Sequence, residues 1–301
     1  MRAWLMVVAV LALVGCTHAP PPGPKIDPAL AGLIPADTTL LAGVRLESIE
    51  KTPLYQSSLA HRDIPFIDEF AKRVGIDPRK ALWELLYVSN GQRSALLGHG
   101  MFSDEGEPKL QNRGDTRFGY KGFTLVGGDV NAILLVNQTV LAIGETDELK
   151  AMVDAHEKSA GPPAGMAALL ARMPATAQIW TAFSSSAIKL PLDSGSSLNN
   201  ANKILSMIES GTLYLDLSHG LTGTAVATGR SDHDAEQLES GFTAMLSLVQ
   251  VAMPKNQPDL QKVWDGVRLA RQNREIRLQI DEPEDLAGQL VELVMGKAGA
   301  K

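Results

Sequence analysis

The chain has 301 residues, of which 45% are hydrophobic, and its formal net charge is −6. A chain of this length and apolar content has enough material for one large domain or two smaller ones. The acidic balance and the 5% aromatic content exclude a typical nucleic-acid surface, which needs basic stripes and aromatic stacking platforms. We therefore expect a globular protein with no nucleic-acid partner.

The N-terminus has the pattern of an export signal. Arg2 precedes an apolar run, Leu5–Val14, that is too short to span a bilayer, for which about 20 apolar residues are needed. The run ends in Leu13-Val14-Gly15-Cys16, which resembles the lipobox of bacterial lipoproteins, where a small residue precedes a lipid-modified cysteine. The resemblance implies a signal peptide over residues 1–15, cleavage before Cys16 and acylation of that cysteine, for example with palmitate.

Cys16 is the only cysteine in the chain, so no disulfide can form within it. An ordinary signal peptide that happens to contain a cysteine, or a short buried N-terminal helix, are the alternatives. A lone cysteine at the cleavage point favours lipid attachment. Since each buried acyl methylene contributes about 0.8 kcal/mol, several chains on Cys16 would hold the protein firmly at a membrane.

The residues after the cysteine predict where the protein is held and how. Thr17 occupies the position at which many lipoproteins retained in the inner membrane carry aspartate. The lipoprotein resemblance therefore implies the outer membrane, facing the periplasm. Residues 16–28 form a proline-rich tether, which extends by about 3.1 Å per residue where it adopts polyproline geometry.

A second proline and glycine cluster, Ser159–Gly165, divides the rest of the chain as a linker between residues 29–158 and 166–296. Both segments open with an apolar-Pro-Ala step followed by a strand, predicted at Leu40–Leu46 and Ala177–Phe183. A hairpin follows in each. The predicted hairpins join Leu85–Ser89 to Ser94–Leu97 through Asn90-Gly91, and Leu213–Leu217 to Thr224–Ala227 near His219-Gly220.

Further strands and helices complete the two segments. The remaining strands are predicted at Gly122–Val126, Ala132–Val136, Val140–Ile143, Val267–Ala270 and Ile276–Ile280. The helices are predicted at Phe66–Val74, Pro78–Glu84, Glu145–His156, Asn199–Glu209, Asp234–Val251, Leu260–Trp264 and Pro283–Val294, with a tail at 297–301. We predict an α+β fold of two tandem, related units, each a mainly antiparallel sheet with helices packed on one face.

Three short motifs support this organisation: Pro35–Thr38, Tyr120–Gly122 and Val140–Gly144. Together they resemble a diffuse family of secreted bacterial lipoproteins whose shared pattern includes no catalytic motif. The resemblance spans most of the chain after Cys16, and it implies a fold rather than an activity.

Ser186-Ala-Ile-Lys189 has the spacing of the catalytic Ser-x-x-Lys of penicillin-binding proteins and serine β-lactamases. In those enzymes the serine opens a helix, whereas Pro191 here prevents a helix from continuing past Lys189. Ser197 and Lys297, which match the other two elements of that site, are respectively too close in sequence and near the C-terminus. We therefore expect no catalytic residue and no enzymatic activity.

Metal or cofactor binding has no support in the spacing of the candidate ligands. The chain has neither a second cysteine nor a His-x-x-x-His pair. Asp232-His233-Asp234 is the densest candidate, but Ser231 or Asp232 as the N-cap of the long helix explains it better. We predict no metal site and no cofactor, and we expect His219 in a turn and His99 in a strand.

The leading functional hypothesis is a membrane-anchored, non-enzymatic binding or scaffold module with a protein partner in the envelope. An alternative is a carrier of a lipid or other hydrophobic ligand, suggested by the apolar helix segment Phe242–Met253. Such a segment is more commonly core, and it can also line a groove or contact a second subunit. An acyl-serine hydrolase that uses Ser186 is a minor alternative.

Overall fold

The computed structural model describes residues 23–60, 78–102, 116–158, 161–184, 204, 206–252 and 258–298. Several sequence predictions fall outside these residues. They are the lipobox with Cys16, the helix Phe66–Val74, and the serine motif with Ser186, Lys189 and Ser197.

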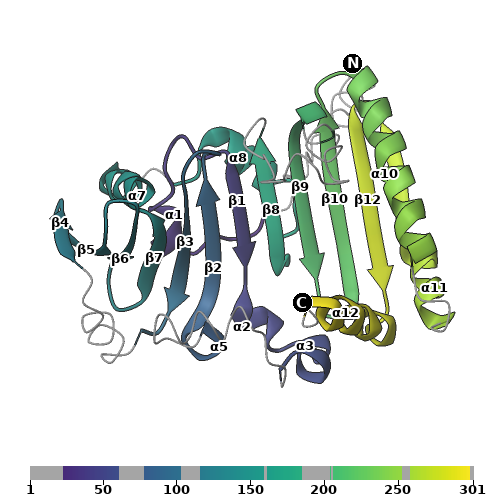
Figure 1. Ribbon diagram of the computed structural model, residues 1–301, viewed down its shortest axis with the longest axis horizontal. Helices are drawn as coiled ribbons and strands as arrows, with labels where there is room; N and C mark the ends of the chain where they lie inside the picture. The colour runs from purple at the N-terminus through teal and green to yellow at the C-terminus, as the bar shows by residue number, and fades with distance from the viewer. Residues whose placement is uncertain are drawn as a thin grey trace, which may run out of the picture.

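The described strands form one twelve-stranded antiparallel sheet (Figure 1). From one edge to the other, the sheet contains β11 (Arg268–Gln272), β12 (Glu275–Glu282), β10 (Leu221–Gly229), β9 (Ile208–Asp216), β8 (Ile179–Ser184), β1 (Leu40–Val44), β2 (Leu82–Ser89), β3 (Ser94–Gly100), β7 (Val140–Glu145), β6 (Asn131–Leu135), β5 (Phe123–Gly127) and β4 (Arg117–Tyr120). The predicted α+β class with antiparallel strands is therefore confirmed.

The two halves of the chain meet at the centre of this sheet. β1 pairs with β8, in a register that places Leu40 opposite Phe183 and Val44 opposite Ile179. Outward from this junction the order is β1-β2-β3-β7 on one side and β8-β9-β10-β12 on the other, so both halves begin with the same arrangement. The two sheets predicted from the sequence are thus one sheet, while the duplication of the sequence stays a prediction.

Helices pack on both faces of the sheet. The helices in the described residues are α1 (Pro28–Ala31), α2 (Leu46–Ile49), α3 (Pro53–Ser58), α5 (Pro78–Ala81), α7 (Thr146–Lys158), α8 (Ala164–Leu170), α10 (Asp232–Ala252), α11 (Pro258–Gly266) and α12 (Glu284–Ala298). α1, α7 and α8 cover one face, where their apolar side chains enclose Leu86 and Trp180. α10 packs on the opposite face, against Ile276 and Ala227 of β12 and β10, beside one end of the sheet (Figure 1). The sequence predicted helices on one face of each sheet, whereas in the structure helices pack on both faces.

The hairpin turns form where their residue types predicted them. Gly91 has φ of 85°, a left-handed conformation that glycine adopts at little cost. The side-chain oxygen of Asn90 accepts hydrogen bonds from the backbone N–H groups of Gln92 and Arg93, at 3.0 and 2.9 Å. The turn between β2 and β3 is thereby closed by its own side chains. Gly220, with φ of 106°, has the same left-handed conformation between β9 and β10.

Two predicted boundaries in the first half are wrong, one because a helix begins earlier and one because strands pair. The predicted strand Leu40–Leu46 ends before Arg45, because Arg45 is the N-cap of α2. The predicted helix Pro78–Glu84 stops after one turn, because Leu82 and Glu84 pair with β3.

Two boundaries in the second half are also wrong. Residues 199–203 and 205 of the predicted helix Asn199–Glu209 lie outside the described residues, and the prediction extends too far at its end, because Ile208 pairs with Gly229 and belongs to β9. The predicted linker Ser159–Gly165 is shorter than expected, because Pro163 is the N-cap of α8.

Both ends of the described fold extend further than predicted. Asp27 caps α1, its Oδ1 accepting a hydrogen bond from the backbone N–H of Ala29 at 2.8 Å, so the fold begins within the predicted tether. Lys297, placed in a tail by the sequence, lies in α12, which no proline interrupts.

Candidate functional site

A pocket of about 480 Å³ lies where the predicted tether enters the fold. We call it the tether-proximal pocket. Residues 25–28 form one wall, and β2, β3 and the start of α2 form the others. The side chains that matter for its chemistry are those of Asp27, Arg45, Trp83, Glu84 and His99.

A bulge in β2 brings two consecutive side chains into this pocket. The register between β2 and β3 shifts between Leu82 and Glu84, so that Leu82 faces Gly100 and Glu84 faces His99. Trp83, between them, has no partner in the register. Side chains that follow one another in a regular strand point to opposite faces, whereas a bulge redirects one of them. Trp83 and Glu84 therefore both line the pocket.

His99 is held in the pocket by a carboxylate and an aromatic ring. Its Nδ1 lies 3.3 Å from Oδ2 of Asp27. The ring of Trp83 meets the imidazole edge-on, with the centroids 5.0 Å apart and an interplanar angle of 83°. Because Asp27 also caps α1, one carboxylate fixes both the helix start and the histidine.

Glu84 is the most perturbed acid of the pocket. Its pKa is raised to about 7, first by burial and then by the negative charge of Asp27, while the backbone N–H of Asp27 and the charge of Arg45 act in the opposite direction. Oε1 of Glu84 is buried and has no hydrogen-bond partner among the described residues. The pocket thus presents an unused acceptor, or a carboxyl proton, beside an aromatic ring, and it can hold a polar or cationic group.

Arg45 connects this pocket to the other half of the chain. Its Nη1 donates a hydrogen bond to the backbone oxygen of Ala175, at 3.1 Å. Its backbone N–H donates to the oxygen of Gln178, at 2.8 Å. The position of the guanidinium group is therefore fixed by the junction between the two halves.

The hydrogen bonds around the Asp232–Asp234 segment support its interpretation as the capped start of a helix. The backbone N–H of Asp234 donates to Oγ of Ser231 at 3.1 Å, and the Ser231 hydroxyl donates to Oδ2 of Asp234 at 2.7 Å. Ser231 therefore caps α10. Within the described residues, no group of three or more His, Cys, Asp or Glu side chains is placed to hold a metal ion.

Sequence reasoning placed His99 correctly in a strand and His219 in a turn, but it missed that His99 lines a pocket. The contact with Asp27 joins positions that are far apart in the chain. The bulge that directs Trp83 toward the pocket has no signature in the residue pattern.

The apolar segment Phe242–Met253 is only partly core. Phe242 packs against the cluster that includes Leu238. Met245, Leu248 and Val251 follow on the same helix and are exposed by 48%, 71% and 81%. The expectation that the segment is core is wrong for this second half of α10, and the segment contributes no wall to the pockets described here. No helix in the described parts of the chain is long and apolar enough to cross a membrane.

Comparison with solved structures finds a similar architecture in TP0453. Crystal form III of TP0453 aligns with a TM-score of 0.50 and 10% sequence identity, over 90% of this chain and 98% of that chain. The fold resembles that of TP0453. Crystal form I of TP0453 aligns with a TM-score of 0.49 and 8% identity, over 89% of this chain and 98% of that one. No family model and no curated protein matches the sequence.

Proposed function

We propose that this chain is a lipid-anchored, non-enzymatic protein of the bacterial envelope that binds a ligand or a partner protein close to the membrane surface. The lipid is carried by Cys16, and Thr17 favours the outer membrane, with the folded part in the periplasm. The observation that carries the proposal is the continuity between the predicted tether and the tether-proximal pocket, since residues 25–28 form part of the pocket wall.

The chemistry of the pocket supports binding. Trp83 offers an aromatic surface, and Glu84 offers a buried oxygen without a hydrogen-bond partner in the described residues. Leaving such an oxygen unpaired costs free energy that an incoming donor recovers. No comparable observation favours a carrier of hydrophobic ligands, because Met245, Leu248 and Val251 of α10 are exposed instead of enclosing a described cavity.

Mass spectrometry of the natively purified protein tests the anchor. We expect an N-terminus at Cys16 with a mass increase from acyl chains, and release of a Cys16→Ser variant from the membrane fraction. A protein whose N-terminus is at another residue, or a wild-type chain without acyl groups, would refute the anchor. Thr17→Asp tests the destination, since the proposal predicts that this variant moves from the outer to the inner membrane.

Site-specific photo-crosslinking in cells tests the binding role. A photoreactive amino acid is placed at Trp83, and the matched control carries it at Val130, which is 73% exposed and lies outside the pocket. We expect one defined adduct from position 83 and none from position 130. The same adduct from both positions would contradict a role for the pocket.

An acyl-serine activity probe tests the absence of enzymatic activity. The proposal predicts no labelling of the wild-type chain. Labelling that disappears in Ser186→Ala would instead support the hydrolase hypothesis.

A further inference from the structure

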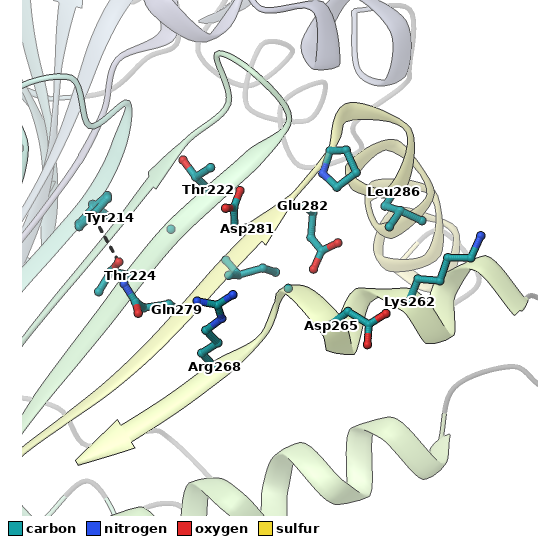
Figure 2. A pocket seen from close by; sticks show the side chains of 14 residues that line it. Tyr214, Thr222, Thr224, Lys262, Asp265, Arg268, Gln279, Asp281, Glu282 and Leu286 are labelled. Carbon is teal, nitrogen blue, oxygen red and sulfur yellow. Dashed lines mark hydrogen bonds between the residues drawn. The ribbon is translucent and has the colours of Figure 1, made fainter.

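A second pocket, of about 530 Å³, lies at the edge of the sheet formed by β11 and β12 (Figure 2). It is bounded by the hairpin of β11 and β12, by the end of α11 and by the start of α12, and we call it the hairpin pocket. Figure 2 shows charged side chains from the hairpin and from α11 around it, with Glu282 between the two helices, while α12 contributes Leu286. The charged residues that line it are Lys262, Asp265, Arg268, Asp281 and Glu282.

Glu282 is the buried group of this pocket. Only 2% of the residue is exposed, and its Oε1 has no hydrogen-bond partner among the described residues. Burial raises the pKa of this carboxyl, and the negative charges of Asp281 and Asp265 raise it further. A buried carboxyl that lacks a partner and is surrounded by like charge needs a cation nearby in order to ionise.

Two glycines fix the position of this carboxyl. A Cβ at Gly266 would lie 2.2 Å from Oε1 of Glu282, so only glycine leaves room for the carboxyl at the end of α11. A Cβ at Gly220 would lie 2.2 Å from the backbone oxygen of Glu282. The turn between β9 and β10 therefore packs directly against the residue that carries the carboxyl. The backbone at Gly266 and at Gly220 therefore packs closely around Glu282.

A cation that pairs with Oε1 of Glu282 is better supplied by an organic ligand than by a metal ion. Three carboxylates line the pocket, yet no set of three acidic, histidine or cysteine side chains in the described residues converges on one point. A divalent ion needs its oxygen ligands within about 2.0–2.6 Å. An ammonium group needs only one or two acceptors at hydrogen-bond distance, which a single buried carboxylate supplies.

The cationic side chains of the pocket indicate that a ligand also carries an anionic group. Lys262 and Arg268 are exposed and come from α11 and β11, whereas Glu282 is buried. An anionic group beside Arg268 would meet a guanidinium, and arginine binds carboxylate and phosphate in a bidentate manner. Leu286 and Ile280 also line the pocket and offer apolar surface to a short carbon chain.

We propose that the hairpin pocket binds a small zwitterion, with its primary ammonium group on Glu282 and its anionic group toward Arg268. An amino acid and the phosphoethanolamine headgroup of a lipid share this chemistry. The site is separate from the tether-proximal pocket, and its occupancy does not depend on the proposed anchor.

Isothermal titration of the purified full-length chain in detergent tests the proposal with matched probes. These are 4-aminobutanoate, butanoate without the ammonium group, and butylamine without the carboxylate. We expect 4-aminobutanoate to bind, butylamine to bind more weakly and butanoate to give no signal. O-phosphoethanolamine is the fourth probe. Tighter binding of this phosphate points to a lipid headgroup, and tighter binding of 4-aminobutanoate points to a free amino acid.

Variants identify the groups responsible. Glu282→Gln removes the charge at nearly constant volume and should weaken 4-aminobutanoate binding by about tenfold or more. Arg268→Gln, at an exposed position, should weaken 4-aminobutanoate but leave butylamine unchanged. Binding of butanoate as tight as that of 4-aminobutanoate, or no binding of any probe at millimolar concentration, would overturn the proposal. If Glu282→Gln does not fold, Arg268→Gln and the probe series on the wild-type chain still decide the outcome.

Discussion

At the scale of single residues, the clearest feature is the buried carboxyl of Glu84, whose protonated form is stabilised in the folded chain. The pKa of Glu84 is about 7 in the folded chain, against an ordinary value of 4.5. The folded state therefore binds this proton more tightly than the unfolded state does. The associated stability is complete below about pH 4.5 and is lost as the pH rises through 7.

Glu84→Gln should therefore stabilise the protein at high pH. Each unit of pKa shift corresponds to 1.36 kcal/mol, and partial exposure of the group reduces the effect, so we expect a gain of about 2 kcal/mol at pH 8 and almost none at pH 4.5. Urea unfolding at the two pH values measures the difference. Glu47→Gln is the control, because the ion pair with Lys51 lowers the pKa of Glu47. A gain that is equal at both pH values would show that ionisation of Glu84 is not its source.

A second residue-scale prediction concerns the contact between Gly43 and Trp180, where the halves join. A Cβ at Gly43 would lie 2.2 Å from Cε2 of Trp180, which is fully buried. Gly43→Ala must push the indole out of its position, and overpacking of this kind costs about 1–3 kcal/mol. Gly119→Ala is the control, because the nearest atom to its Cβ would be 4.0 Å away. Urea unfolding should show a loss for Gly43→Ala alone, and equal losses in both variants would contradict the role of the contact.

At the scale of elements, α10 divides into a packed half and an exposed half. Leu238 is fully buried, whereas Leu248 is 71% exposed on the same helix. Leu238→Ala should cost about 2–5 kcal/mol, since it removes buried contacts and leaves a cavity. Leu248→Ala should change the free energy of unfolding by no more than about 0.5 kcal/mol. Equal losses measured by urea unfolding would mean that the second half is covered in solution.

The same helix shows what a sequence pattern can and cannot predict. Its start was predictable, because Ser231 and Asp234 form a local cap. Its exposure was not, because burial depends on where the sheet ends, and that follows from pairing between distant strands. For the same reason the turn at Asn90-Gly91 was found from its residue types, whereas the bulge at Trp83 was not.

At the scale of the whole molecule, the sequence predicted two related halves but not how they join. The junction consists of pairs such as Leu40 with Phe183, which are far apart in the chain and carry no local signal. The main core draws on both halves. It contains Leu41 and Leu86 from the first half and Trp180 and Ala182 from the second. The linker is therefore a boundary in sequence and not a boundary between separate cores.

This shared core predicts that the two halves unfold together. If β8 left the sheet, Trp180 would be exposed and β1 would lose the neighbour that covers one of its edges. Neither half can then retain its packing alone, so calorimetry should show one transition whose calorimetric and van't Hoff enthalpies agree. Leu86→Ala in the first half and Leu238→Ala in the second should each shift that whole transition to lower temperature. Two separate transitions, each shifted by only one of the two variants, would show that the halves are independent domains.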